Sequence, residues 1–401
     1  MPTRRPAGIP LPSSPAGPDV TGHVHDLGQG LAGTALYQGV LARDHGHWQT
    51  AHTIMRTLAG KPATVHGRSA SLYRGAPAVA YALHTAGHRA YQKALDTLDE
   101  RIAPLIHARL TTAAHRLDTG APPRMREYDL ISGLTGLGAY LLHRGTRPDL
   151  LDGVLRYLVR LLQEPVTVHG QYVPGWWTSD SPKGRPDEGW PNGHGNFGMA
   201  HGAAGPIALL ALCARAGHQV PGHRQALRQG CQLLTDRARP ESGGACWPET
   251  LTLEQWLDGP RSRTRPGRPS WCYGTPGIAR SLQLAALASN QPGVQRRAEN
   301  ILASCAADPE QLARITDATV CHGWAGLCLA LDRAASDAGP DSALRHHRRT
   351  ARERLRAYAD ETSLPRTAGL LTGADGILLT LHTLTSASSV APGWDTCLLL
   401  A

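Results

Sequence analysis

The chain has 401 residues, of which 41% are hydrophobic, enough to bury one large core or two ordinary ones. Its 41 Lys and Arg outnumber its 32 Asp and Glu, giving a formal net charge of +9. No apolar run approaches the roughly 20 residues of a membrane span. The sequence also lacks the basic stripe interleaved with aromatic residues that would indicate a nucleic-acid partner. We therefore predict a cytoplasmic protein that neither spans a membrane nor binds nucleic acid.

The chain begins with a proline-rich stretch, MPTRRPAGIPLPSSPAGPDVTG, that lacks the apolar core of a secretory signal. We predict a flexible N-terminal segment at 1–22, followed by a single domain at 23–401. A reducing compartment keeps the eight cysteines of the chain as thiols, so that some of them are available to bind metal.

Seven short glycine patterns, each opening an apolar run, recur through the domain at intervals of about 45 to 70 residues. One example is GQGLAGTALY, and the second pattern is degenerate because Ala78 replaces its second glycine. The first glycines of the seven patterns are Gly30, Gly75, Gly133, Gly202, Gly274, Gly323 and Gly373. A repeat of this length fits a helical hairpin.

The two kinds of helix in each hairpin indicate how the hairpins pack. The runs after the glycines are apolar on most sides, which places them inside, whereas stretches such as 88–110 have one polar face and belong outside. We predict an all-α fold, an α/α toroid of about seven hairpins, with an open solenoid as the alternative. Only about 25 residues follow the last pattern, too few for a full outer helix.

Two long segments interrupt the repeats, at 164–197 and 237–270, and both are rich in proline and glycine. Loops of this length inside a compact domain are often functional. Five tryptophans lie in them: Trp176, Trp177, Trp190, Trp247 and Trp256. We expect these loops to form the walls of a substrate cleft; the alternative, which is compatible with it, is that the tryptophans form a small core beneath the loops.

The glycine register brings metal-binding side chains together. Cys272 and Cys321 each lie two residues before the first glycine of their repeat, and His322 lies one before. Equivalent positions of successive repeats are neighbours on one rim of a toroid, so two thiolates and an imidazole converge as a three-ligand zinc site.

Two more polar groups share this rim. His201 lies one residue before its glycine, and Asp129 lies four before the glycine of the preceding repeat. Asp26 has the same register as Asp129, so spacing alone leaves the choice of carboxylate open.

The other six cysteines lie outside this register. Cys213, Cys305 and Cys328 fall in apolar helical patterns and are expected in the core. Cys231, Cys246 and Cys397 remain candidates for a fourth metal ligand.

Four segments, YDLISGLTGLGAYLL, NFGMAHGAAG, SWCYGTPGI and CHGWAG, resemble the successive signature motifs of the LanC lanthionine synthetase C family. These proteins are the cyclases of class I lanthipeptide biosynthesis, and the resemblance extends over roughly residues 23–390. It implies an α/α toroid with one zinc ion at the mouth of the barrel. The chain length implies a stand-alone cyclase without a fused dehydratase.

Carried over by motif, the resemblance implies a role for each of several residues. The implied zinc ligands are Cys272, Cys321 and His322. The implied catalytic residues are the acid/base His201, its carboxylate Asp129, Arg268 four residues before the first cysteine, and Tyr273 beside it. Asp129 is preferred to Asp26 because it lies in the Tyr-Asp-hydrophobic motif.

The implied reaction adds a substrate cysteine thiolate to dehydroalanine or dehydrobutyrine, a Michael-type addition that forms lanthionine or methyllanthionine. The implied partners are a dehydrated precursor peptide with its leader, a class I dehydratase and an export transporter. We expect the basic surface, including the arginines of 261–268, to attract an acidic leader or the dehydratase, although it could simply be a solvated face.

Two other functions remain open. A protein prenyltransferase subunit is also a zinc-containing α/α barrel, but the single phenylalanine and 5% aromatic content argue against its isoprenoid pocket. The second is a non-catalytic LanC-like zinc protein that binds peptides or small thiols.

Overall fold

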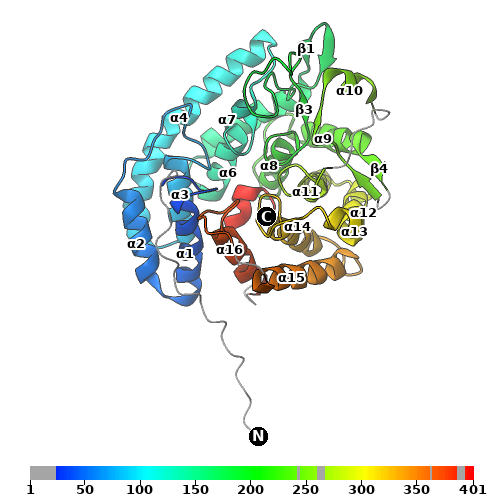
Figure 1. Ribbon diagram of the computed structural model, residues 1–401. Helices are drawn as coiled ribbons and strands as arrows, with labels where there is room; N and C mark the ends of the chain where they lie inside the picture. The colour runs from blue at the N-terminus through cyan, green and yellow to red at the C-terminus, as the bar shows by residue number, and fades with distance from the viewer. Residues whose placement is uncertain (1–23, 242–243, 260–266, 362–363, 386–392) are drawn as a thin grey trace.

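The computed structural model of the chain describes residues 24–241, 244–259, 267–361, 364–385 and 393–401. The predicted flexible segment at 1–22 lies outside the described residues, and so do most of the arginines of 261–268. The described part forms a closed ring of paired helices, with the last residues at its centre (Figure 1).

The inner layer of the ring, as far as the structure describes it, consists of one helix from each glycine pattern. These are α1 (Leu31–His45), α3 (Ala76–Ala86), α6 (Leu134–Arg144), α8 (Ala204–Arg215), α11 (Thr275–Ala288), α14 (Trp324–Asp337) and α16 (Ala374–Thr385). They are buried on nearly all sides, and in α11 every residue from Thr275 to Ala286 is buried. This agrees with their continuous apolar character.

In the six patterns that have a second glycine, this residue allows the entering turn to pack against its helix. A Cβ at Gly277 would collide with the carbonyl oxygen of Trp271, six residues earlier, and a Cβ at Gly326 would collide with the carbonyl oxygen of Val320. Any larger residue at these positions would push the turn away from the helix.

The outer layer consists of amphipathic helices. In the described residues they are α2 (Trp48–Ala59), α4 (Gln92–Thr119), α7 (Pro148–Gln163), α9 (His223–Arg237), α12 (Pro292–Ala307) and α15 (Leu344–Glu361). In α7, for example, Leu151, Leu155 and Leu158 are buried while Arg156 is exposed. The shorter helices are η1 (Arg89–Tyr91), α5 (Met125–Tyr128), α10 (Leu253–Leu257), α13 (Pro309–Leu312) and η3 (Trp394–Leu398).

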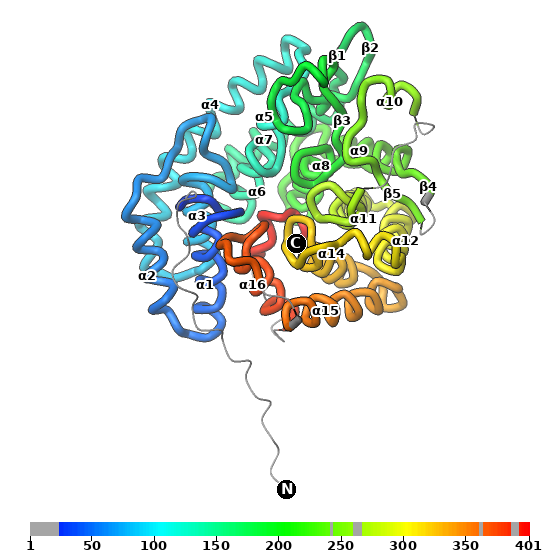
Figure 2. Tube along the Cα trace, in the orientation of Figure 1, coloured from blue at the N-terminus to red at the C-terminus, as the bar shows by residue number. Residues whose placement is uncertain are grey.

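The ring is closed where the first and last repeats meet. Leu370 N donates to Leu27 O at 2.9 Å, and Leu371 N donates to Gly28 O at 2.8 Å. In Figure 2, α1 and α16 lie next to each other at this junction. The structure therefore confirms the predicted α/α toroid and excludes the open solenoid.

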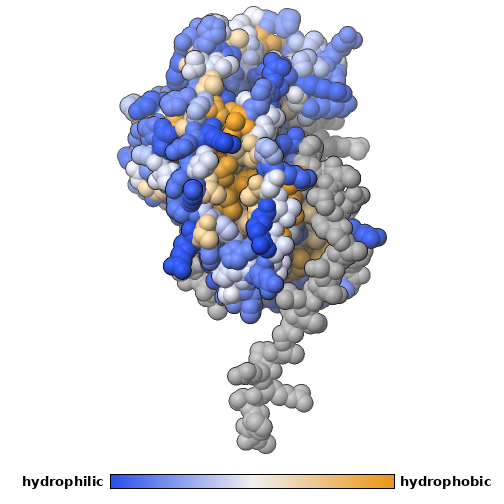
Figure 3. Space-filling view, turned by 90° about the vertical axis from the view of Figure 1, so that its left-hand side faces the viewer, coloured by the Kyte–Doolittle hydropathy of each residue, from blue (hydrophilic) through white to orange (hydrophobic). Residues whose placement is uncertain are grey.

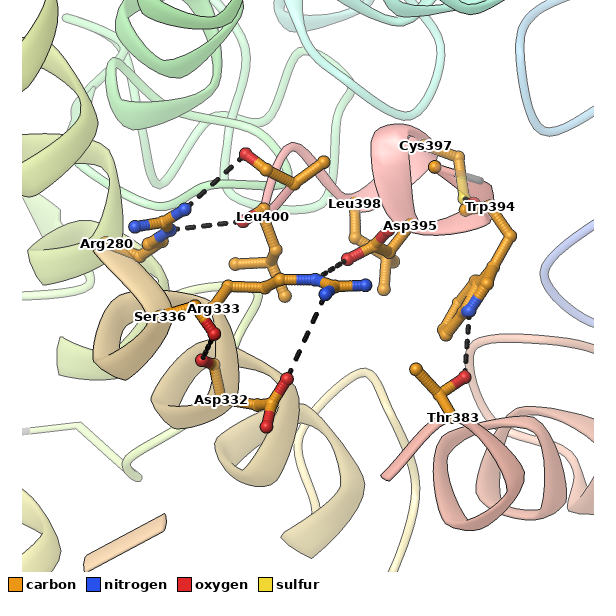
Figure 4. A network of polar contacts seen from close by, with 12 residues as sticks. Arg280, Asp332, Arg333, Ser336, Thr383, Trp394, Asp395, Cys397, Leu398 and Leu400 are labelled. Carbon is orange, nitrogen blue, oxygen red and sulfur yellow. Dashed lines mark hydrogen bonds and ion pairs between the residues drawn. The ribbon is translucent and has the colours of Figure 1, made fainter. Parts of the chain in front are cut away.

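The last repeat lacks an outer helix among the described residues, and its C-terminal residues turn into the middle of the ring. Trp394 is fully buried, and its Nε1 donates to Thr383 Oγ1 of α16 at 3.0 Å (Figure 4). Arg333 of α14 donates through Nε to Asp395 at 2.6 Å, and Arg280 of α11 donates to the carbonyl of Leu400 at 3.1 Å. These residues fill the space that the inner helices leave between them.

The two long interruptions pair with each other on one side of the ring. β1 (Val166–Val168) and β2 (Gln171–Val173) form an antiparallel hairpin, and β4 (Arg239–Glu241) pairs with β5 (Gly244–Cys246). β3 (Gly195–Asn196) of the first interruption pairs with β6 (Thr250–Leu251) of the second, antiparallel.

The tryptophans of these loops are mainly core residues. Trp177 is fully buried in a small cluster with three valines of the hairpin and Leu253, and Trp256 meets its ring edge-on at 5.9 Å. Trp176 and Trp247 belong to the main core. A core beneath the loops is therefore the better description of these residues than the wall of a cleft.

One side of the ring is mostly polar at its surface. On the side that carries α2 and α4, hydrophilic residues surround a band of apolar ones (Figure 3). Within the described ranges, no helix is both long enough and apolar enough to cross a membrane.

Candidate active site

One rim of the ring is joined by backbone hydrogen bonds between successive repeats. Ala200 N donates to Cys272 O at 3.1 Å, Cys272 N donates to Cys321 O at 3.2 Å, and Cys321 N donates to Leu371 O at 2.9 Å. Each of these residues lies two positions before the first glycine of its repeat. Equivalent positions of neighbouring repeats are therefore adjacent, as the register predicted.

The two rim cysteines contact each other through their thiols. The hydrogen bond from Cys321 lowers the pKa of Cys272, and the same contact raises the pKa of Cys321. Ser270 Oγ lies 3.6 Å from Cys272 Sγ, and the charges of His322 and His201 lower the pKa of Cys272 further. The pair thus holds one thiolate readily, which is the form that binds soft metals.

His322 is oriented by a carboxylate that the sequence analysis did not identify. Its Nδ1 lies 2.8 Å from Asp317 Oδ2, while Thr319 donates to Asp317 Oδ1 through its backbone N (2.8 Å) and its hydroxyl (2.6 Å). Burial raises the pKa of Asp317, but the hydrogen bonds from His322 and Thr319 outweigh it and bring this pKa to about 2. An ionised Asp317 can only accept, so we assign the proton to Nδ1 of His322, which leaves the lone pair on Nε2.

Arg268 completes this side of the rim. Its Nη1 lies 3.9 Å from Asp317 Oδ2, and its side chain is 38% exposed. The guanidinium is therefore held beside the cysteine pair while remaining accessible from solvent.

His201 and Asp129 form a second pair on the same rim. His201 Nδ1 lies 2.6 Å from Asp129 Oδ2, and Ser132 N donates to Asp129 Oδ1 at 2.6 Å. Burial lowers the pKa of His201, but the charge and hydrogen bond of Asp129 outweigh it, so this pKa is raised. The ring of Tyr273 lies 5.9 Å from that of His201, and burial raises the pKa of its hydroxyl. The imidazole thus carries its proton at a higher pH than an isolated histidine does.

The two carboxylates that share one register have different partners in the structure. Asp129 contacts His201, whereas Asp26 contacts Arg74, with 3.0 Å between Oδ2 and Nε.

The candidates for a fourth metal ligand lie away from the rim. Cys397 is buried in the middle of the ring, where its Sγ lies 3.1 Å from the carbonyl oxygen of Trp394. Cys231 is buried in α9, where burial raises its pKa to about 11, and Cys246 is buried in β5.

The fit of this rim to a metal ion rests on the chemistry of its donors. Among the residues that the structure describes, no three His, Cys, Asp or Glu side chains are drawn together closely enough to form a metal site as they stand. The donor set still fits zinc: two thiols are in contact, and the neighbouring imidazole has its Nδ1 held by a carboxylate, an arrangement found around metal-bound histidines.

Sequence reasoning missed three residues of this rim: Asp317, Ser270 and Asn196. Asp317 lies six positions before its glycine rather than four, so the register of Asp129 did not point to it. Ser270, two residues before Cys272, was detectable as a polar residue next to a proposed ligand. Asn196 is fully buried and accepts from Gly198 N at 2.8 Å.

Comparisons with known proteins agree with this arrangement. Residues 24–399 match the profile of a family described as lanthionine synthetase C-like protein. The chain is 26% identical over 332 residues to the nisin biosynthesis protein NisC of Lactococcus lactis subsp. lactis. The aligned region covers 81% of this chain and 76% of that protein. The fold is similar to that of nisin cyclase, with a TM-score of 0.72 and 24% identity over 94% of this chain and 92% of the other.

Proposed function

The chain belongs to the lanthionine synthetase C-like family, and on that premise we propose that it is a lanthipeptide cyclase that closes thioether rings in a dehydrated precursor peptide. The observation that carries the proposal is the position of the His201–Asp129 pair on the same rim as the Cys272–Cys321 pair. Ring closure needs a deprotonated substrate thiol and a proton donor. The cysteine pair would hold the metal that favours the first, and the His201–Asp129 pair would supply the second.

The residues that would hold a zinc ion are Cys272, Cys321 and His322. When bound, zinc supplies the positive charge that keeps a substrate thiol deprotonated at neutral pH. Asp317 orients the imidazole of His322 so that Nε2, rather than Nδ1, is available to the metal. Ser270 and the backbone contact between the two cysteines keep the thiols next to each other.

The remaining chemistry concerns the position of one proton. In the proposed addition the substrate sulfur bonds to the β-carbon of the dehydro residue, and the electrons of the double bond move to the α-carbon and its carbonyl oxygen. The protonated His201 then donates to the α-carbon. Asp129 stabilises the charged imidazole and so maintains this proton donor at neutral pH.

The developing enolate oxygen requires a positive neighbour. Arg268 is accessible and lies next to the cysteine pair, held there by Asp317. The N-termini of the inner helices point to the same rim and add partial positive charge. We assign enolate stabilisation to these groups together with His201.

We further propose that the substrate carries a leader, that a class I dehydratase produces it, and that an export transporter shares the complex. Because of the excess of basic residues, we expect acidic segments of these partners to bind more weakly as the salt concentration rises.

Two other functions are less well supported. A binding protein for peptides or small thiols would need the cysteines but not a histidine whose pKa is raised by a dedicated carboxylate. A prenyltransferase would need an isoprenoid pocket, whereas Trp394 to Leu400 fill the centre of the ring.

The test is ring closure itself. The protein, supplied with zinc, is incubated with a dehydrated cysteine-containing peptide, and the remaining free thiols are counted with an alkylating reagent because ring closure leaves the mass unchanged. A cyclase consumes the thiols faster than the peptide loses them alone. Binding of the peptide without loss of thiols would favour the binding protein instead.

A further inference from the structure

The junction between the third and fourth repeats shows how the rim presents His201. Leu130, three residues before its glycine, donates through its backbone N to Ala200 O at 3.0 Å. This contact sets the two entering turns side by side. Asp129, one residue earlier, then reaches His201 Nδ1 at 2.6 Å. The buried carboxylate of Asp129 therefore binds Nδ1 of the imidazole, and Nε2 remains for a ligand.

The junction between the first and second repeats has the same construction. Leu27, also three residues before its glycine, donates through its backbone N to Tyr73 O at 2.9 Å. Asp26, one residue earlier, reaches Arg74 Nε at 3.0 Å. Arg74 lies one residue before Gly75, so it occupies in the second repeat the place that the catalytic histidine occupies in the fourth.

Asp26 holds Arg74 through its Nε atom and its backbone, while the end of the side chain is exposed. Asp26 is 4% exposed, and its other oxygen accepts from Gln29 N at 2.8 Å. Asp26 and Arg74 also form a backbone β-bridge, which fixes the chain at the base of the guanidinium. The Arg74 side chain is 58% exposed, and in the described part of the molecule its two terminal nitrogens make no hydrogen bond.

The ion pair with Asp26 uses only the Nε atom of Arg74. The two terminal nitrogens of Arg74 remain as a planar pair of donors fixed at an exposed position of the rim. This is the geometry with which arginine binds a carboxylate through two parallel hydrogen bonds.

We propose that Arg74 is a binding residue for a carboxylate group of the peptide substrate, an Asp or Glu side chain located some residues away from the reacting cysteine. This proposal rests on the proposed function, because it assumes that the molecule bound at this rim is a peptide substrate. It adds a specificity determinant to the rim, because a peptide with a carboxylate at the right spacing is held in place while its ring closes.

The test uses short fluorescein-labelled peptides that cannot react, with one cysteine and with alanine in place of the dehydro residue. A single Glu is moved along the peptide, and each peptide has a twin with Gln. Binding to the full chain is followed by fluorescence anisotropy. At the productive spacing we expect the Glu peptide to bind about three- to tenfold more tightly than its Gln twin at low salt, the scale of a partly exposed charge pair.

Substitutions in the protein assign this preference to Arg74. Arg74→Gln should abolish it, and the double variant Asp26→Asn, Arg74→Gln should do the same without leaving a buried carboxylate unpaired. Arg228→Gln removes one exposed positive charge from α9 and should leave the preference intact. Equal binding of all Glu and Gln twins by the wild-type chain, or a preference that survives in the double variant, would overturn the proposal.

Ring closure distinguishes this proposal from the proposed function. On a reactive Glu-containing peptide, Arg74→Gln should raise KM and leave kcat unchanged, as expected for loss of uniform binding. A chain that closes rings with no preference for Glu refutes only the role of Arg74. A chain that prefers Glu and closes no ring refutes only the cyclase.

Discussion

His201 Nδ1 lies 2.6 Å from Asp129 Oδ2, and this contact unites residues 72 positions apart in the sequence. It holds Nδ1 of the imidazole and raises the pKa of His201, whose side chain is 28% exposed. His322 and Asp317 repeat the arrangement at 2.8 Å. Two histidines of one rim are thus oriented in the same way, and we propose that His201 transfers a proton and that His322 binds metal.

The first prediction concerns the pH dependence of ring closure. If protonated His201 is the donor, the rate should fall as the pH rises through its raised pKa. Asp129→Asn removes the group that raises this pKa and leaves the burial that lowers it, so the falling limb should move to lower pH. If the rates of the wild type and Asp129→Asn fall over the same pH range, His201 is not the proton donor in ring closure.

The same pair affects the stability of the fold. Because the folded pKa of His201 is above the unfolded value, its contribution to stability is complete below about pH 6.5 and is lost as the pH rises through the folded pKa. The difference in free energy of unfolding between the wild type and Asp129→Asn should therefore shrink with rising pH, and denaturant titrations at several pH values measure it. A difference that grows with pH would contradict the assignment.

The next prediction concerns metal content. Cys272→Ala and Cys321→Ala should each lose most of the bound zinc and stay helical by circular dichroism. Cys213→Ala is the matched control, because this thiol is buried in α8 away from the rim and should not affect zinc. Full zinc content in both rim variants, measured by elemental analysis, would refute the proposed ligand set.

Asp317 should tune the affinity for zinc. Asp317→Asn keeps the size of the side chain but removes the charge that favours the proton on Nδ1 of His322, so zinc affinity should fall by about 10- to 100-fold. Asp308→Asn is the control, because Asp308 also accepts from nearby backbone N–H groups, at the start of α13. Competition with a chromogenic chelator measures both variants, and equal affinities would show that Asp317 has only a local structural role.

Filling of the ring by the C-terminal residues should contribute to stability. Trp394→Ala removes a fully buried ring and its hydrogen bond to Thr383, and such truncations cost about 3–5 kcal/mol in free energy of unfolding. Tyr172→Ala, at a side chain that is 77% exposed, should change it little. Denaturant unfolding of the two variants makes the comparison, and similar midpoints would mean that the centre of the ring adds little.

Local patterns in the sequence were sufficient to predict the ring and the cysteine pair, because each glycine pattern marks the same place in its repeat. They could not predict the entry of Trp394 to Leu400 into the ring, since this segment has no helical period and its partners lie on three different helices. The contact of Arg74 with Asp26 was also missed, although its two residues have the same glycine register as Asp129 and His201.

The most direct test of the account is the rate of thiol loss from a dehydrated peptide with the His201→Asn variant. This variant leaves the proposed metal ligands intact, so it should keep its zinc and bind the peptide. Ring closure should be slower by about 10² to 10⁴, the usual contribution of general acid–base catalysis. The residual rings should have mixed configuration at the α-carbon, because a proton from solvent has no fixed face. Ring closure at the wild-type rate and with wild-type stereochemistry would contradict the account.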